Sequence, residues 1–137
     1  MGCVFCEIVR GEAPASFVHQ DENVVAFLDI RPFTTGHLLV VPRRHAVGLG
    51  DLDEDLGTEL WRIAHRLGGA LRRSGLRCDG VNLFLADGEA AFQEVFHFHL
   101  HVIPRFRGDR IQLRAKPRRP GRRELDEVAA AVREAGL

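Results

Sequence analysis

Three histidines occupy alternate positions near residue 100, in the segment V-F-H-F-H-L-H-V-I-P-R: they are His97, His99 and His101. Side chains alternate between the two faces of a β-strand, so this spacing would place all three imidazoles on one side. The residues between them are apolar, and valine and phenylalanine favour strands. We therefore predict a strand over residues 95–105 with a histidine face. The buried face of that strand is predicted to consist of Phe98, Leu100 and Val102.

A single histidine in a strand is usually a packed residue, but three on one face need a stronger explanation. Each ring carries polar nitrogens that must find partners when they are buried. Two kinds of site use several histidines close together. One is a metal site, and the other holds a nucleophilic imidazole among orienting partners. The spacing alone leaves both open.

A second group of reactive side chains lies at the N-terminus, where Cys3 and Cys6 form a C-x-x-C pair. A redox dithiol usually opens a helix after a strand, and no strand fits ahead of Cys3. The pair is therefore either half of a zinc site or two incidental small residues. A zinc site would need two more ligands, which His45 or the histidine triad can supply. Three cysteines, an odd number, argue against a disulfide framework and for a reducing cytoplasm.

Apolar periodicity predicts an α+β scaffold for these residues. The expected strands cover residues 17–20, 24–30, 37–41, 81–86 and 95–105. The expected helices cover residues 3–10 and 51–73, and a short amphipathic helix with Leu125, Val128, Ala129 and Val132 ends the chain. The long helix carries an apolar stripe of Leu56, Leu60, Ile63, Leu67 and Leu71. Asp51 and Glu54 resemble a capping box at its start.

Two polar side chains stand at the ends of predicted strands. Asp29 follows an apolar run, where it either caps a turn or accepts hydrogen bonds from ligand hydroxyls. His37 begins the third strand beside Gly36, where the absence of a side chain permits close approach to the backbone.

Length and charge limit the classes of partner. With 137 residues, 45% of them hydrophobic, the chain is long enough for one domain with a real core. The formal net charge is zero, so neither nucleic acid nor a membrane is an expected partner. No apolar run could span a bilayer, and the first residues lack signal-peptide character. Residues 105–123 are nevertheless strongly basic, and residues 114–123 contain two prolines, so we predict a basic loop there.

Five short blocks resemble the signature segments of the histidine triad (HIT) superfamily, in that family's order. They are F-C-E-I at 5–8, A-F-L-D-I at 26–30, G-H-L-L-V-V-P at 36–42, H-F-H-L-H-V-I at 97–103 and H-V-I-P-R at 101–105. The resemblance covers roughly residues 3–110. It implies a HIT domain over 1–110, with the basic loop and C-terminal helix of 111–137 packed on the same domain. It also implies a homodimer of α+β protomers, each with an antiparallel sheet of about five strands, one long helix and short terminal helices.

The family consists mainly of nucleotide hydrolases and transferases that act on an α-phosphate. The resemblance therefore implies cleavage of a purine nucleoside phosphoramidate or related adenylyl compound through a covalent nucleotidyl-histidine, without a catalytic metal or organic cofactor. The alternatives are a dinucleoside polyphosphate hydrolase and a non-catalytic purine-nucleotide-binding module. A more distant alternative is a zinc hydrolase that uses all three triad histidines as ligands.

Residue roles follow from the same resemblance. His99 corresponds to the nucleophile, His37 to a fourth active-site histidine, and His97 and His101 to the flanking members of the triad. The nucleotide-binding positions are Phe5, Ile8, Phe27, Asp29, Ile30, Gln93, His99 and His101, with Asp29 on the ribose hydroxyls. In members with an N-terminal C-x-x-C, a structural zinc is bound at the positions of Cys3, Cys6, His45 and His97. This chain departs from the phosphoramidase branch at Glu94, which replaces a serine expected to contact phosphate.

Overall fold

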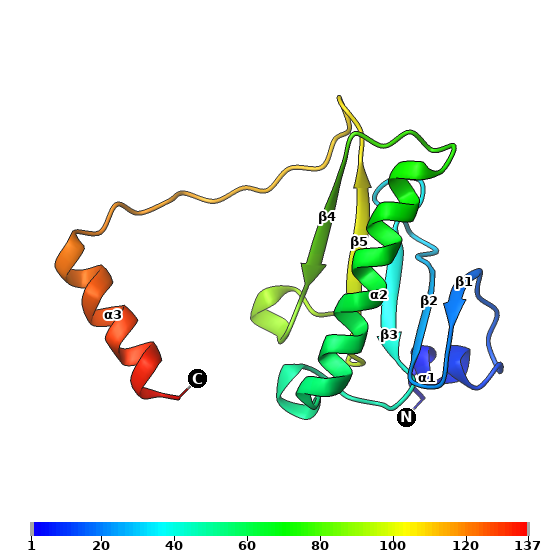
Figure 1. Ribbon diagram of the computed structural model, residues 1–137, viewed down its shortest axis with the longest axis horizontal. Helices are drawn as coiled ribbons and strands as arrows, with labels where there is room; N and C mark the ends of the chain where they lie inside the picture. The colour runs from blue at the N-terminus through cyan, green and yellow to red at the C-terminus, as the bar shows by residue number, and fades with distance from the viewer. Residues whose placement is uncertain (1, 137) are drawn as a thin grey trace.

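Residues 2–136 are described by the computed structural model, in which a five-stranded antiparallel sheet has the strand order β1-β2-β3-β5-β4 (Figure 1). The strands are β1 (Phe17–Gln20), β2 (Val24–Leu28), β3 (Leu38–Pro42), β4 (Gly80–Leu85) and β5 (Leu100–Arg105). The helices are α1 (Val4–Val9), α2 (Glu54–Arg73) and α3 (Arg122–Glu134), with short 3₁₀ turns η1 (Leu49–Asp51) and η2 (Glu89–Ala91). This architecture confirms the predicted α+β fold.

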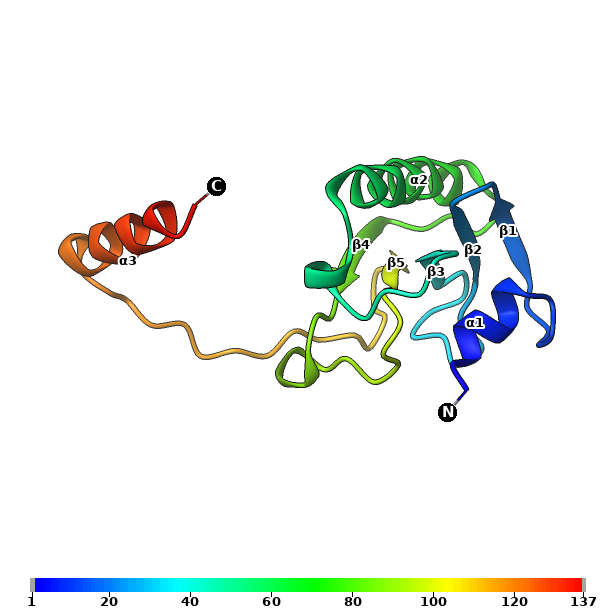
Figure 2. The ribbon, with the colours of Figure 1, turned by 90° about the horizontal axis from the view of Figure 1, so that it is seen from below.

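Helix α2 covers one face of the sheet (Figure 2). Its predicted apolar stripe faces the sheet, with Leu60, Ile63 and Leu71 buried and Leu56 and Leu67 packed against them. The sheet contributes the buried residues Val24, Ala26, Leu38, Val40, Leu100 and Val102. Burying such side chains contributes about 1.5–3 kcal/mol each, so this layer is the main source of stability.

The start of α2 differs from the prediction. Asp53 is the N-cap, because its side chain accepts a hydrogen bond from the Leu56 amide at 2.9 Å. Asp51 instead lies in η1, where its carboxylate accepts a hydrogen bond from the Val47 amide. The capping box predicted from Asp51 and Glu54 is therefore wrong by two residues.

Helix α1 lies on the opposite face of the sheet (Figure 2). Its inward side chains, Phe5 and Ile8, pack against a second apolar cluster formed by Val25, Phe27, Leu39 and Val41. Strands β2 and β3 are thus covered on both faces, which explains why their sequences are almost wholly apolar. This arrangement also brings the N-terminal cysteines under the histidine segment.

Only one of the three triad histidines lies in the strand. β5 begins at Leu100, so His101 is in the sheet while His97 and His99 precede it. The ladder between β3 and β5 stops at the pair Val40 and Leu100, and the Phe98 amide donates instead to the Ala46 carbonyl at 2.6 Å. The predicted start of the strand at residue 95 is therefore wrong, although Phe98, Leu100 and Val102 are buried as expected.

Gly36 fixes the entry to β3. Its φ angle of +96° is strained for residues with a side chain. A Cβ there would also lie 2.7 Å from Leu76 Cδ1 and 3.3 Å from Pro104 Cγ. The chain can therefore turn into β3 at His37 only because residue 36 has no side chain.

The segment after β5 does not pack on the sheet as predicted for residues 111–137. Beyond Asp109 the chain is extended, and α3 stands apart from the rest of the protein (Figure 1). No α3 residue among those described is buried. The linker of residues 110–121 holds two prolines and a run of basic side chains, and its few apolar residues, such as Ile111 and Leu113, are too little surface to fold it back onto the domain. The predicted bounds also include residues 1 and 137, which lie outside the described part of the chain.

Candidate active site and metal centre

His99 has one ring nitrogen held and one free. Its Nδ1 lies 2.7 Å from the backbone oxygen of His97, and a carbonyl can only accept, so Nδ1 carries the hydrogen. The remaining nitrogen, Nε2, must then hold the lone pair. The ring is 7% exposed and packs edge-on against Phe5 at 5.1 Å between centroids. This hydrogen bond orients the His99 ring, and in the uncharged imidazole it leaves Nε2 as the nitrogen with a lone pair available for attack.

His101 and His37 form a hydrogen-bonded pair whose direction can be derived. The Phe33 amide donates to His37 Nδ1 at 3.0 Å, so the hydrogen of the His37 ring is on Nε2. That Nε2 lies 2.8 Å from His101 Nδ1 and donates to it. The hydrogen of the His101 ring is consequently on Nε2. The centroid of the His101 ring lies 4.9 Å from that of His99, so the ring with this Nε2–H donor is a direct neighbour of the ring with the free nitrogen.

Burial keeps this pair uncharged. Burial, together with the neighbouring rings of His99 and His37, lowers the pKa of His101 to about 4. Burial also lowers the pKa of His37, although the Asp29 carboxylate, 3.7 Å from His37 Nε2, opposes this effect. At neutral pH both rings are therefore neutral, and each has a single ring hydrogen. His37 uses both nitrogens within the protein, so it positions His101 and has no donor left for a ligand.

The predicted nucleotide-binding residues lie together but differ in exposure. Asp29 follows β2, and its Oδ1 accepts a hydrogen bond from the Arg31 amide while its side chain remains partly accessible. Phe5, Ile8 and Phe27 are buried beneath this region, whereas Ile30 is 90% exposed. An open hollow beside them is lined by Pro14, Ala15, Ser16, Leu28, Asp29 and Ile30. Among the predicted apolar pocket residues, only Ile30, at the rim of this hollow, therefore exposes apolar surface to a ligand.

The four predicted zinc ligands converge. The His97 Nδ1 lies 3.4 Å from Cys3 Sγ, 3.5 Å from Cys6 Sγ and 3.2 Å from His45 Nδ1, and all four donor atoms lie within 4.8 Å of one another. Since the Pro42 carbonyl takes the hydrogen of His97 Nε2 at 2.8 Å, Nδ1 presents a lone pair to this cluster. Tetrahedral zinc with nitrogen and sulfur ligands separates the ligand atoms by about 3.3–3.8 Å. The residues therefore fit a Cys₂His₂ zinc site.

This geometry also separates His97 from the reaction site. Both of its nitrogens point away from His99 Nε2, one to Pro42 and one to the cysteines. The three triad rings therefore do not converge on one metal ion, contrary to the zinc-hydrolase alternative. Burial lowers the pKa of His97, which keeps it neutral and suited to ligation.

Gln93, expected at the nucleotide, is instead a buried brace. Its Oε1 accepts a hydrogen bond from the Gly88 amide at 2.8 Å. Its Nε2 donates to the carbonyls of Val47 at 2.7 Å and Val95 at 3.2 Å. These bonds use both of its amide hydrogens, so Gln93 joins the η2 turn to the segment that carries His97 and His99. Glu94 beside it is exposed.

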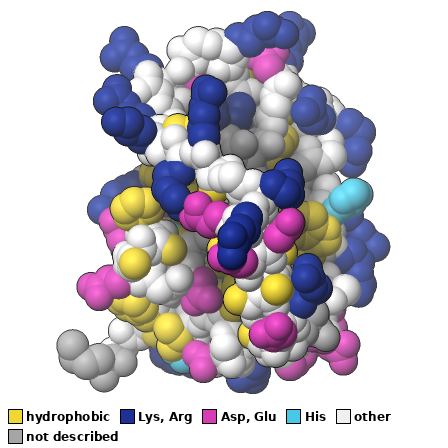
Figure 3. Space-filling model, turned by 90° about the vertical axis from the view of Figure 1, so that its left-hand side faces the viewer, with side chains coloured by type: hydrophobic (Ala, Val, Ile, Leu, Met, Phe, Trp, Pro, Cys, Tyr) yellow, Lys and Arg dark blue, Asp and Glu magenta, His cyan; other side chains and the backbone are white. Residues whose placement is uncertain are grey.

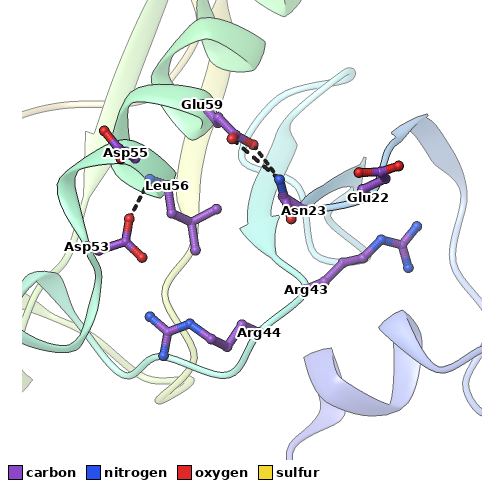
Figure 4. Close-up of a pocket in the computed structure, with 8 residues that line it drawn as sticks. All are labelled: Glu22, Asn23, Arg43, Arg44, Asp53, Asp55, Leu56 and Glu59. Atoms are coloured by element: carbon purple, nitrogen blue, oxygen red, sulfur yellow. Dashed lines mark hydrogen bonds between the residues drawn. The ribbon is translucent and has the colours of Figure 1, made fainter.

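Another hollow lies away from the histidines, between the turn before β2 and the start of α2 (Figure 4). Its lining residues are Glu22, Asn23, Arg43, Arg44, Asp53, Asp55, Leu56 and Glu59. Asn23 donates to Glu59 across it, and Asp53 caps the helix. Arg43 and Arg44 donate to the carbonyls of Asp21 and Asp51, so most of the polar groups around this hollow have structural partners.

Comparison with known proteins agrees with this site. A family model described as the HIT domain matches residues 10–108. An uncharacterized HIT-like protein of Mycobacterium tuberculosis is 46% identical over 113 residues, 82% of this chain and 78% of that protein. A HIT family protein from Bacillus anthracis is 32% identical, with a TM-score of 0.92 over 99% of this chain and 98% of that one. A Zn-bound histidine triad protein from Mycobacterium smegmatis is 45% identical, with a TM-score of 0.79 over 99% of each chain. This chain belongs to the HIT family.

Two contacts that define the site come from backbone groups that no sequence pattern singled out. They are the Phe33 amide, which sets the tautomer of His37, and the Pro42 carbonyl, which sets that of His97. Backbone donors and acceptors exist at nearly every residue, so only the fold identifies which ones matter.

Among the residues that the structure describes, none of the helices combines the length and the apolar character that a membrane span requires.

Proposed function

We propose that the protein is a nucleotide hydrolase that cleaves at the α-phosphate of a purine nucleotide through a covalent nucleotidyl-His99. The observation that supports this most directly is the hydrogen bond from His99 Nδ1 to the His97 carbonyl at 2.7 Å. This bond leaves Nε2 as the nucleophile and orients the ring. A general binding site would not need a histidine tautomer fixed in this way.

The reaction has two displacements at phosphorus. His99 Nε2 attacks the α-phosphorus, the bond to the leaving group breaks, and the departing amine or phosphate takes its proton from solvent. Water then attacks the same phosphorus, the bond to Nε2 breaks, and the proton that the water loses passes to solvent. The products are a nucleoside monophosphate, the amine or phosphate leaving group, and free His99.

His101 has the clearest electrostatic role in both steps. Its Nε2–H donates to a non-bridging phosphate oxygen, whose negative charge increases as the bond to phosphorus forms. His37 holds the other nitrogen of this ring, so the donor does not need to reorient during the reaction. His37 is therefore a positioning residue, and Asp29 beside it binds the ribose hydroxyls.

The nucleotide base lies against the apolar rim at Ile30, above the buried side chains of Phe5, Ile8 and Phe27. A flat apolar ring covers exposed hydrophobic surface there at little cost. Gln93 contributes indirectly, by holding the histidine segment.

A structural zinc ion is bound by Cys3, Cys6, His45 and His97. When bound, the ion cross-links the N-terminus to the segment before β5. His97 belongs to this site, and its carbonyl orients His99, so it supports the nucleophile from outside the reaction. Two free thiolate ligands require a reducing environment, which favours the cytoplasm.

The protein forms a homodimer through the free edge of β4. This strand, G-V-N-L-F-L, has no charged residue and no proline, the usual features that protect an exposed edge. Pairing with β4 of a second copy would satisfy its open backbone groups.

The test is to compare kcat/KM for an adenosine phosphoramidate and a diadenosine polyphosphate, during brief chelation, in the wild type and in His99→Ala. The proposal is supported if the wild type cleaves the phosphoramidate in preference to the dinucleotide and His99→Ala cleaves neither. That result would also make Glu94 a candidate selector of amine leaving groups. Preference for the dinucleotide would assign the substrate to the dinucleoside polyphosphate class. Nucleotide binding without turnover of either substrate by the wild type would favour a binding module.

A further inference from the structure

The C-terminal arm, residues 110–136, carries apolar side chains with nothing of its own chain to cover them. Leu113 is 95% exposed in the extended linker, and Leu125, Val128 and Val132 of α3 are 41%, 56% and 57% exposed. The three α3 residues recur at spacings of three and four, so they form one stripe along the helix. Figure 3 views the molecule from the α3 side, where hydrophobic side chains lie open among charged ones.

A helix of this size is not stable on its own. α3 has 13 residues, and isolated helices shorter than about 12–15 residues are marginal in water. Its ion pairs, Arg122 with Asp126 and Arg123 with Glu127, are exposed and contribute little. Most helical stability in proteins comes from packing of an apolar face. α3 therefore needs a surface that its own chain does not provide.

The position of the arm is shared with a solved structure. The B. anthracis protein aligns over 99% of this chain with a TM-score of 0.92. Residues up to 110 could contribute at most 110/137 of a full score, so the arm must superpose as well. The M. smegmatis structure, aligned over the same share of the chain, agrees less closely, with a TM-score of 0.79. The direction of the arm is therefore common to two proteins that are only 32% identical.

The arm leaves on the side of β4, the edge at which we propose the second copy pairs (Figures 1 and 2). Its origin is fixed, because Arg105 donates to Asp109 at 2.6 and 2.8 Å and to the Ile111 carbonyl at 3.1 Å. The extended linker of residues 110–121 can span roughly 40 Å at about 3.3 Å per residue. Strands lie about 4.8 Å apart, so this reach is enough to cross the sheet of a neighbouring copy.

Charge favours the same partner. Residues 105–123 contain nine basic and one acidic side chain, a net charge of +8. Residues 1–104 contain nine basic and 14 acidic side chains, a net charge of −5. The positive linker of one copy is therefore attracted electrostatically to the negative body of a second copy. A partner with a basic surface would repel it.

We propose that two copies of this chain exchange their C-terminal arms, so that the Leu125–Val128–Val132 stripe of each α3 packs on the body of its partner. The body of the chain also exposes large apolar side chains, among them Trp61, Phe92 and Phe96, against which such a stripe can pack. This inference rests on the dimer proposed above, but it is independent of the chemistry at His99.

The test uses the full chain with a photo-reactive phenylalanine analogue at position 125, and the same analogue at Ala130 on the opposite side of α3 as the control. Copies labelled with ¹⁴N and ¹⁵N are mixed, allowed to exchange and irradiated. We expect position 125 to give cross-linked peptides that contain one ¹⁴N and one ¹⁵N partner, and position 130 to give far fewer. Cross-links only within one chain, or none above background at position 125, would overturn the exchange.

A second pair of variants tests the apolar stripe. Val132→Asp buries a carboxylate in the proposed interface, whereas Ala130→Asp adds the same charge at the control position. We expect Val132→Asp to raise the dimer dissociation constant at least tenfold in analytical ultracentrifugation and Ala130→Asp to change it less than threefold. Equal effects would contradict the assignment of the stripe. No nucleotide is needed, so failure here and failure of the nucleotidyl-His99 proposal are distinguishable.

Discussion

Replacement of Gln93 by alanine distinguishes a structural brace from a nucleotide-binding side chain. The Gln93 side chain pairs with three backbone groups, the Gly88 amide and the carbonyls of Val47 and Val95, and the residue is only 4% exposed. A buried polar group that loses its partner costs about 1–3 kcal/mol. Since water can enter the truncated space and satisfy some of these groups, we expect Gln93→Ala to lower the free energy of unfolding by about 2–4 kcal/mol.

Urea denaturation followed by circular dichroism measures this loss. With an m-value of about 2 kcal/mol/M, the midpoint should fall by about 1–2 M. Gln93→Glu, which keeps the acceptor but turns a carboxylate toward two carbonyls, should be at least as unstable. The matched control is Glu94→Ala at the exposed neighbouring position, with a change within about 0.5 kcal/mol. Unchanged stability of Gln93→Ala together with weakened nucleotide binding would refute the brace.

Three further predictions concern charge, metal and backbone. The contribution of neutral His101 to the free energy of unfolding should be fully present above pH 6.5 and should fall by up to about 3 kcal/mol toward pH 4. The reason is that the pKa of His101 is about 4 in the folded protein and about 6.5 in the unfolded chain. Urea denaturation at several pH values should find a smaller loss in His101→Asn. Cys3→Ser should bind less than half of the wild-type zinc by mass spectrometry and melt at a lower temperature, whereas Cys78→Ser should keep its zinc; full zinc content in Cys3→Ser would exclude the proposed ligand. Gly36→Ala should destabilise the fold by more than about 1 kcal/mol in urea denaturation, because φ is +96° and the new Cβ would overlap Leu76; an unchanged midpoint would show that the turn can relax.

The elements that bury apolar side chains could be predicted from the sequence. The apolar stripe of α2 has to be covered by the sheet, and the apolar runs of β2 and β3 have to be covered on both faces. In each case only packing of one element on the other removes the apolar surface from water. The cysteine spacing alone left a zinc site and two incidental residues equally open, and the resemblance to the HIT family is what indicated His45 and His97 as the further ligands.

The limits of the histidine strand could not be predicted in the same way. Alternation of apolar and histidine residues does not reveal that the Phe98 amide bonds to the Ala46 carbonyl, outside the sheet, so that the ladder begins only at Leu100. The roles of the individual rings also depend on backbone atoms far away in the sequence. His97 and His99 look equivalent in the sequence, but the Pro42 carbonyl directs one toward the cysteines and the His97 carbonyl holds the other for attack.

The surface on which the C-terminal helix packs also could not be predicted from the sequence. Its apolar stripe predicts that it packs on something, but amphipathicity does not say whether the surface belongs to the same chain. The linker, with its two prolines and high charge, decides this by remaining extended.

The most direct test of the proposed function is to incubate the protein with an adenosine phosphoramidate, quench it in acid-free denaturant, and map any adduct by mass spectrometry. We predict a nucleotidyl group on His99 in the wild type and none in His99→Ala, with His97 and His101 unmodified in both. An adduct that persists in His99→Ala, or turnover by that variant at the wild-type rate, would contradict the central role of His99.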